Sequence, residues 1–112
     1  MKTAKKDGPS IIPQKQPSEC FFCGKQFDLV KHHCLHGRGI KPLAVEDGLW
    51  IWICAADHNG NNDSVHLDPE RKKDKYLQGL AQETLIKKYV KQGYPKDVAR
   101  GLFLQRYGRF YD

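Results

Sequence analysis

Two short stretches of the chain carry the apolar and β-branched side chains that are typical of strands. Residues 28–35 form the first, and residues 49–54 (LWIWIC) form the second, which combines isoleucine with tryptophan. Gly37 and Gly39, followed by Pro42, indicate a loop between them. We therefore expect two strands that pair antiparallel.

Apolar residues recur at helical spacing in the C-terminal part of the chain. Asp68 and Pro69 are typical of an N-cap and a first helical residue, and Gly93 is typical of a helix end. These signals predict a long helix over 69–92. A second, shorter helix is predicted over 95–107.

The two ends of the chain are expected to behave differently. Residues 1–19 mix Lys, Pro, Gln, Ser and Gly with few large apolar residues, so burial cannot offset the entropy lost on ordering. We expect a flexible basic tail over 1–19 and a single domain over 20–112. At the other end, the aromatic residues Phe110 and Tyr111 are expected to fold back onto the core.

The net charge of +6 is unevenly placed along the chain. Residues 1–68 hold eight Lys or Arg and eight Asp or Glu, whereas residues 69–112 hold eleven against five. Such an excess fits a surface that meets a polyanion, most often nucleic acid, although a solvated helix can carry it too. No segment is apolar enough to cross a bilayer or resembles a signal peptide, so we expect a cytoplasmic protein.

Cysteine spacing points to a metal site. Cys20 and Cys23 form a CxxC pair, and Cys54 with Asp57 repeats that spacing after the second predicted strand. Thiolates and a carboxylate are acceptable zinc ligands, and a reducing compartment disfavours disulfides. We predict a structural zinc site made of these four residues, with Cys34 as the alternative to Asp57. The competing interpretation is that Cys34 and Cys54 are small buried residues.

Four histidines suggest a second site: His32, His33, His58 and His66. Successive side chains leave a strand on opposite faces, so His32 and His33 cannot both bind one ion in a regular strand. Two roles follow. One imidazole can hold a divalent ion while its neighbour removes a proton from water.

The order of these motifs resembles the HNH endonucleases of the His-Me finger, or ββα-metal, superfamily, and most of all the compact versions found in phage genomes. The resemblance covers about residues 20–90 and rests on residues 31–33 (KHH), 54–60 (CAADHNG) and 65–66 (VH). It implies an α+β fold: a small ββα-metal core with a zinc knuckle, a long helix and a shorter C-terminal helix.

The resemblance also implies a function and assigns roles. The chain would be a metal-dependent endonuclease that hydrolyses DNA phosphodiester bonds, acting in the host cytoplasm if it is phage-encoded. His33 would be the general base. The catalytic divalent ion, whether Mg²⁺, Mn²⁺, Ni²⁺ or Zn²⁺, would be bound by His32, His58 and His66.

Cationic side chains complete this expectation. Arg38, in the loop between the strands, can clamp a phosphate with its planar fork, or it is only a loop cation. Lys72 and Lys73 on the long helix can hold the flanking DNA backbone. The asparagine that orients the base in this family has no match in residues 46–49. The candidates for its place are Asn59, Asn61 and Asn62.

Two other functions fit the same sequence. The first is a non-catalytic zinc-binding module that binds nucleic acid or a protein partner, which needs only the cysteine site. The second is a protein that uses zinc only for folding, with incidental histidines. The number of metal ions bound per chain distinguishes both from the endonuclease, which requires two sites.

Overall fold

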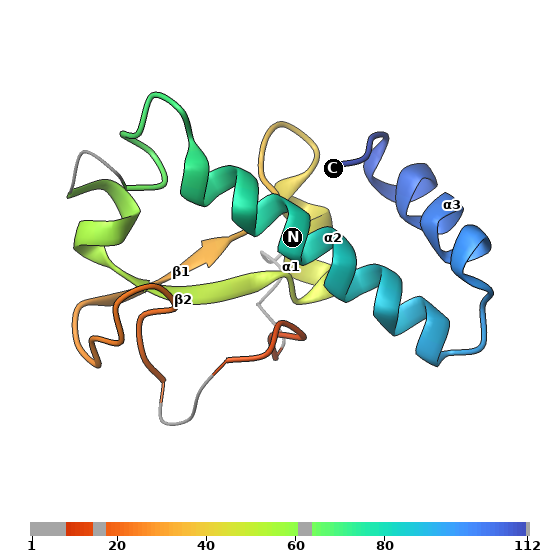
Figure 1. Cartoon of the computed structure of the whole chain (residues 1–112), viewed down its shortest axis with the longest axis horizontal. Helices are drawn as coiled ribbons and strands as arrows, with labels where there is room; N and C mark the ends of the chain where they lie inside the picture. The colour runs from red at the N-terminus through yellow and green to blue at the C-terminus, as the bar shows by residue number, and fades with distance from the viewer. Residues whose placement is uncertain (1–8, 15–17, 61–63, 112) are drawn as a thin grey trace, which may run out of the picture.

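The computed structural model describes residues 9–14, 18–60 and 64–111, and it contains both strands and helices (Figure 1). In chain order, the elements are β1 (Leu29–His33), α1 (Lys41–Asp47), β2 (Trp50–Cys54), η1 (Ala56–Gly60), α2 (Lys72–Lys91) and α3 (Lys96–Tyr107). Of these, η1 is a short π-helical turn. The predicted α+β class is confirmed.

The strands β1 and β2 form a two-stranded antiparallel sheet, as the sequence predicts. The register pairs His32 with Ile51 and His33 with Trp50. Because side chains alternate along a strand, His32 shares one face of the sheet with Ile51 and the buried Ile53. His33 leaves the other face, on the side of Trp50. The sheet therefore separates the two neighbouring histidines, and His32 is only 4% exposed.

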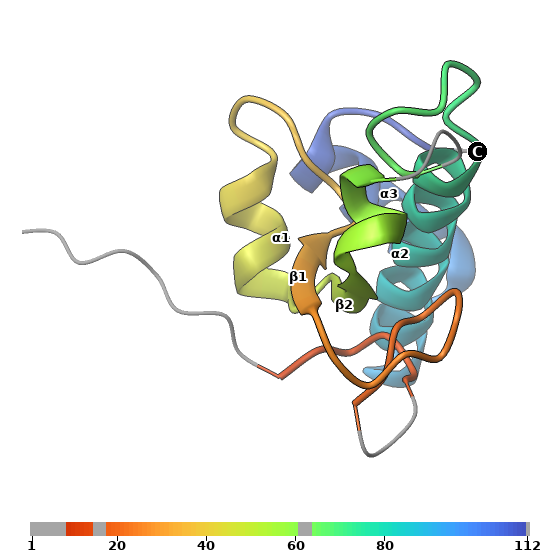
Figure 2. The same ribbon diagram turned by 90° about the vertical axis from the view of Figure 1, so that its left-hand side faces the viewer.

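Helix α2 crosses one face of the sheet, and α3 lies beside it (Figures 1 and 2). Leu77, Ala81 and Leu85 follow one another at every fourth position of α2 and are buried in the same core as the β2 isoleucines. Helix α3 is tied to α1, because Arg106 Nε and the Tyr107 hydroxyl donate to Asp47 Oδ2 at 2.7 and 2.6 Å. The predicted long and short helices are both present.

The C-terminal aromatic residues fold back, as predicted. The backbone N–H of Tyr111 donates to the side-chain oxygen of Gln82 at 2.6 Å. The ring of Phe110 lies parallel to that of Phe103, with centroids 6.4 Å apart. This end of the chain therefore covers the outer part of the α2 and α3 core.

The sequence predicts a loop between the two strands, but only part of this segment is a loop. Residues 37–40 do turn, but Pro42 lies in the first turn of α1, where its missing N–H costs no hydrogen bond. Gly48 ends this helix in the left-handed conformation, with φ 68°. Its backbone N–H donates to the carbonyls of Ala44 and Val45. Proline thus begins a short helix here.

Helix α2 begins at Lys72 rather than at Pro69. The Asp68 carboxylate accepts the backbone N–H groups of Glu70 at 3.0 Å and Lys72 at 3.2 Å, so a turn precedes the helix. Arg71 occupies the N-cap position in the left-handed conformation, with φ 55°. Asp68, the predicted N-cap, therefore lies three residues before the N-cap position. Its carboxylate still accepts the first N–H group of the helix.

Residues 9–14 pack against β2, in contrast to the flexible tail expected over 1–19. The Ser10 hydroxyl donates to the carbonyl of Trp50 at 2.6 Å, and Trp52 N–H donates to Gln14 Oε1 at 2.9 Å. Ile12 is 3% exposed and belongs to the core. The expectation overlooked that two isoleucines next to an open strand edge gain burial and hydrogen bonds together.

Candidate metal centres

Four side chains converge at one end of the sheet: Cys20, Cys23, Cys54 and Asp57, called here the cysteine group. Each offers one ligand atom, and these atoms all lie within 4.8 Å of one another. Asp57 Oδ2 accepts from the Cys20 thiol at 3.2 Å and from the Cys54 thiol at 3.3 Å. The sulfurs of Cys23 and Cys54 are 3.6 Å apart. The four residues can hold a metal ion.

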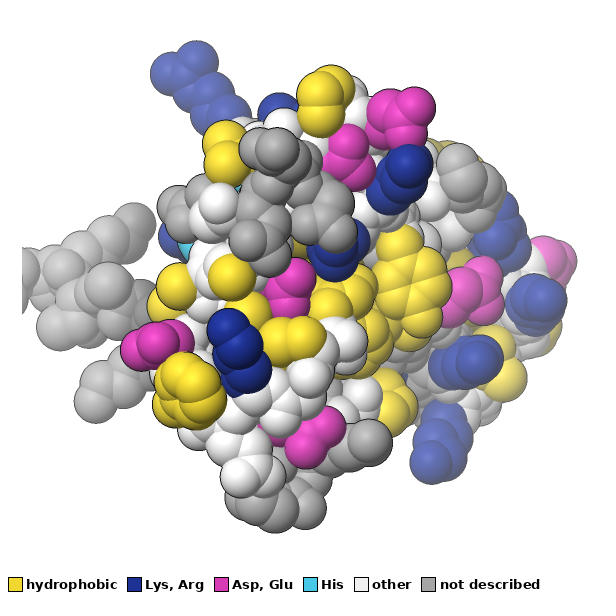
Figure 3. All heavy atoms as spheres, turned by 60° about the vertical axis from the view of Figure 1, so that its left-hand side comes forward, with side chains coloured by type: hydrophobic (Ala, Val, Ile, Leu, Met, Phe, Trp, Pro, Cys, Tyr) yellow, Lys and Arg dark blue, Asp and Glu magenta, His cyan; other side chains and the backbone are white. Residues whose placement is uncertain are grey.

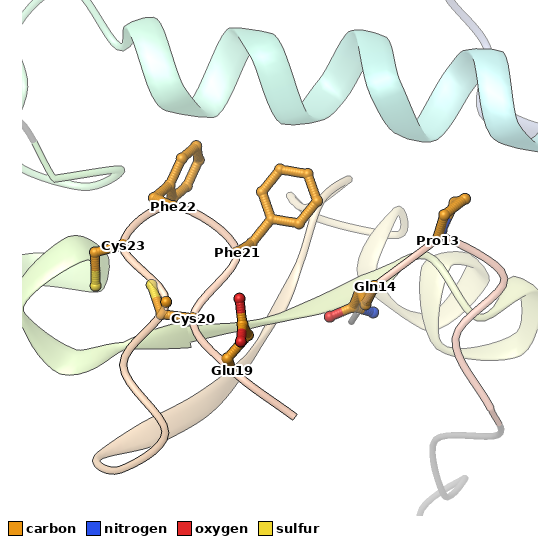
Figure 4. A pocket seen from close by; sticks show the side chains of 8 residues that line it. Pro13, Gln14, Glu19, Cys20, Phe21, Phe22 and Cys23 are labelled. Carbon is orange, nitrogen blue, oxygen red and sulfur yellow. The ribbon is translucent and has the colours of Figure 1, made fainter. Parts of the chain in front are cut away.

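Local structure brings these ligands together. Cys20 N–H donates to the Lys25 carbonyl at 2.7 Å and Gly24 N–H donates to the Cys20 carbonyl at 3.0 Å, which closes a tight turn. Gly24 adopts φ 80°, as expected from its position. Figure 4 shows Phe21 and Phe22 of this turn directed toward α2, with the two cysteines beside them. The partners of the CxxC pair come from the end of β2 and from η1.

The electrostatics of the cysteine group favour a cation. A backbone hydrogen bond at Lys25 lowers the pKa of the Cys23 thiol, but burial and the neighbouring Cys20, Cys54 and Asp57 side chains raise it, to about 12 overall. Several groups that would each carry negative charge are thus crowded together, and the charge of Lys73 is the nearby cation that acts on Asp57. A bound metal ion would relieve that repulsion and deprotonate the thiols.

Cys34 is not part of this group. It is fully buried in the hydrophobic core, and burial, with the nearby charge of Asp74, raises the pKa of its thiol. The structure therefore favours Asp57 over Cys34 as the fourth member. The interpretation of a small buried residue holds for Cys34, whereas Cys54 points at the other ligands.

Three imidazoles form a second cluster, called here the histidine group: His32, His58 and His66. Each offers one ring nitrogen, and these nitrogens lie within 4.8 Å of one another. His58 Nε2 and His66 Nε2 are 3.0 Å apart. The ring centroid of His32 lies 5.5 Å from that of His58 and 5.7 Å from that of His66. All three residues named as ligands by the sequence are therefore brought together.

Backbone pairing holds two of these rings side by side. His66 N–H donates to the carbonyl of His58 at 3.2 Å, and Val65 N–H donates to the carbonyl of Asp57 at 2.9 Å. Residues 65–66 therefore run along the π-helical turn that also supplies Asp57 to the cysteine group. One short element thus serves both clusters.

The His32 ring has a buried nitrogen that lacks a partner. Its Nε2 makes no hydrogen bond to any described residue, although burial without one costs about 1–3 kcal/mol. Burial, together with the charges of His58, His36 and His66, lowers the pKa of His32 to about 3. The ring is therefore neutral near pH 7, with a lone pair available. A metal ion facing the three nitrogens would satisfy it.

The sequence reasoning missed a fourth imidazole at this cluster. His36 lies with its ring centroid 6.0 Å from that of His32 and 6.4 Å from that of His66. Its Nε2 is 2.9 Å from Oδ1 of Asp74, a carboxylate that is 3% exposed. Asp74 precedes Leu77 on the apolar face of α2 by three positions. A carboxylate at such a position was the signal available in the sequence.

His33, the expected general base, is half-buried on the sheet face opposite His32. Its cross-strand neighbour is Trp50. The alternation expected for the histidine pair is therefore present, and the role of His33 stays a prediction. Of the asparagines proposed to orient the base, Asn61 and Asn62 lie outside the described residues, and the side chain of Asn59 does too.

The expected DNA-binding cations differ in their surroundings. Arg38 is exposed in the turn before α1. Lys72 forms an exposed ion pair with Glu70 at 2.9 Å. The Lys73 ammonium lies 5.4 Å from the centre of the Phe22 ring, near the cysteine group. The positions of Arg38, Lys72 and Lys73 do not define a single basic stripe. The assignment of these residues to DNA binding stays a prediction.

The surface seen in Figure 3 places hydrophobic side chains near the middle of the view, with basic and acidic side chains around them. Among the described residues, no helix combines the length and the apolar character that a membrane span needs. Comparisons with family models, with curated proteins and with solved structures find no match for this chain. What the chain does must therefore be argued from its own residues.

Proposed function

We propose that this protein is a metal-dependent endonuclease of the HNH type, which hydrolyses DNA phosphodiester bonds. The observation that carries the proposal is the histidine group: three ring nitrogens lie within 4.8 Å of one another, and the buried His32 ring has an Nε2 with no hydrogen-bond partner among the described residues. Three imidazoles leave coordination positions open for substrate, as catalytic sites require. A structural protein has no need for such an opening.

The arrangement of elements supports the ββα-metal interpretation. Two antiparallel strands are followed by α2, and the histidine ligands come from β1, from η1 and from the turn before α2. The cysteine group, which we propose to bind zinc, joins the turn before β1 to the end of β2. Zinc there would stabilise the same segments that present the histidines, which suits a chain of 112 residues with a small core.

The proposed hydrolysis needs a metal-binding group, a general base and cations that contact the DNA backbone. A divalent ion held by His32, His58 and His66 would supply positive charge for the phosphate oxygens and for the departing alkoxide. His33 would accept a proton from the attacking water, because imidazole side chains can act as general bases near neutral pH. Basic side chains such as Arg38, Lys72 and Lys73 would hold the DNA backbone on either side.

Plasmid cleavage tests the proposal. Purified full-length protein is incubated with supercoiled plasmid and Mg²⁺, Mn²⁺, Ni²⁺ or Zn²⁺, and nicked and linear products are measured. Replacing His33 with Ala should lower the rate by about 100- to 10,000-fold, the usual contribution of a general base. Metal content, measured by mass spectrometry, should be unchanged in this variant.

The result that counts against the endonuclease is intact plasmid with every metal, from folded protein that binds two ions per chain. One tightly bound ion and no second site would instead favour the non-catalytic zinc-binding module. Normal cleavage by His33→Ala would leave the endonuclease in place and remove only the assignment of the base.

A further inference from the structure

The buried carboxylate of Asp74, beside the histidine group, contacts both His36 and Arg71. Asp74 is 3% exposed, and its Oδ1 faces His36 Nε2 at 2.9 Å. Its other oxygen, Oδ2, lies 3.5 Å from Nη1 of Arg71. Although burial alone raises the pKa of Asp74, the hydrogen bond and charge of His36 and the charge of Arg71 lower it. Asp74 is therefore ionised and holds both partners.

The backbone of Arg71 is as unusual as its side-chain contact. Among the described residues, Arg71 and Asp28 are the non-glycine residues with positive φ, and that of Arg71 is 55°. This conformation costs about 1 kcal/mol or more for a residue with a Cβ. Among the described residues, the turn before α2 is closed by hydrogen bonds to the Arg71 backbone and not to its side chain. With this backbone conformation, the Arg71 guanidinium lies 3.5 Å from Asp74 at the first turn of α2.

The guanidinium retains capacity for a further ligand. Arg71 has five N–H donors, and its contact with Asp74 uses one edge at a long 3.5 Å. The side chain is 51% exposed, in contrast to the 4% exposure of its partner. A planar fork with one edge anchored and another facing solvent matches the two non-bridging oxygens of a phosphodiester.

We propose that Arg71 binds the phosphodiester next to the histidine group, and that Asp74 is the positioning residue that holds Arg71 and His36 in place. The connection is short: Arg71 touches Asp74, Asp74 touches His36, and the His36 ring packs near His32 and His66. This inference rests on the proposed endonuclease function for its substrate. It assigns the phosphate next to the histidine group to Arg71, whereas Lys72, which is paired with Glu70, would contact the flanking backbone.

Binding of a short fluorescent DNA duplex, measured by anisotropy without added divalent ion, tests the inference independently of cleavage. Arg71→Ala should weaken binding about tenfold, the loss expected for one charge-assisted contact. Arg71→Lys should restore only part of it, because the planar fork is lost. The matched control is Lys91→Ala, which removes the same charge at the far end of α2 and should change binding about twofold or less.

Asp74→Asn gives the sharper test. General electrostatics predict that removing a carboxylate strengthens binding to DNA, whereas a positioning role predicts that binding weakens several-fold because Arg71 is released. Circular dichroism confirms the fold of each variant. The Co²⁺ affinity of the histidine group should be unchanged in Arg71→Ala, which separates a substrate contact from an effect on the metal site.

Each outcome decides one point. Equal binding by wild type, Arg71→Ala and Lys91→Ala overturns the inference, and tighter binding by Asp74→Asn overturns the positioning role. If the wild type binds the duplex through Arg71 but never cleaves DNA with any metal, the inference on phosphate binding stands and the endonuclease fails. If cleavage occurs and Arg71→Ala is normal in both assays, the endonuclease stands and the inference on phosphate binding fails.

Discussion

The cysteine group and the histidine group share the turn η1 but differ in ligand chemistry and in burial. Cys20, Cys54 and Asp57 are buried and Cys23 is exposed, and four ligands of this kind complete a tetrahedral site. The histidine group offers three nitrogens and grades from the buried His32 to the exposed His66. Each cluster has one exposed member, but the cysteine group supplies all four ligands of a closed coordination shell, whereas the histidine group supplies three and leaves a position open.

That difference teaches which cluster suits folding and which suits chemistry. A closed set of ligands joins segments distant in sequence and leaves no position for a substrate, so its contribution is to stability. An open set can bind an ion and still admit a phosphate. If this comparison is right, variants of the first cluster unfold the protein, and variants of the second remain folded but inactive.

The largest effect is expected from the cysteine group. Cys54→Ser removes a ligand that links β2 to the CxxC turn, so the metal should be released and the domain should unfold, because structural zinc supplies about 10 kcal/mol or more in small zinc domains. Thermal denaturation followed by circular dichroism measures it. A folded, cooperative Cys54→Ser variant would contradict the structural role.

The matched control for this prediction is Cys34, which is equally buried but lies outside the group. Cys34→Ala should lower the free energy of unfolding by only about 1 kcal/mol, the scale of a small core truncation. Its metal content should stay at the wild-type value. Equal losses in the two variants would mean that burial, and not metal binding, is what matters at Cys54.

The second largest effect is expected at His32. If the proposed catalytic ion binds here, His32→Ala should lower DNA cleavage by about 1000-fold or more, since electrostatic stabilisation by such an ion is worth several kcal/mol. The variant should bind one metal ion fewer per chain and keep its circular dichroism spectrum, because the buried Nε2 makes no hydrogen bond to the described protein. Unfolding of this variant would erase the distinction between the two clusters.

A smaller effect is expected from pH when only the cysteine group carries metal. The pKa of His32 is lowered from 6.5 to about 3 in the folded protein, so below pH 6.5 the unfolded chain takes up a proton that the folded protein does not. Stability is therefore lost as the pH falls. Between pH 6.5 and 5.5, the wild type should lose roughly 1 kcal/mol more than His32→Phe in urea denaturation. Parallel curves for both proteins would show that His32 does not resist protonation.

The smallest effect is expected from Asp57→Cys, which turns the cysteine group into four thiols. Thiolate suits zinc at least as well as carboxylate, so the variant should remain folded and retain its metal. With Co²⁺ in place of zinc, the sulfur charge-transfer absorption should increase relative to wild type. No change in the spectrum would show that Asp57 is not a ligand, and that its contacts with the cysteine thiols serve another purpose.

Local patterns in the sequence were enough to predict the strands, the long and the short C-terminal helix and, apart from the choice between Asp57 and Cys34, the members of both clusters. Spacing reveals ligands because CxxC turns and short polar turns impose geometry within a few residues. The same reasoning failed at α1, where Pro42 begins a helix, and at residues 9–14, which pack on β2. In both places the outcome depends on partners distant in the sequence.

The sequence by itself determined which side chains can bind metal, because ligand type is a property of each residue and alternation along β1 separates His32 from His33. Only the tertiary structure decided that Asp57 rather than Cys34 joins the cysteine group, and that Asp74 lies buried between His36 and Arg71. The physical reason is that burial and charge pairing depend on which surfaces of α2 and the sheet meet. No local pattern encodes that meeting.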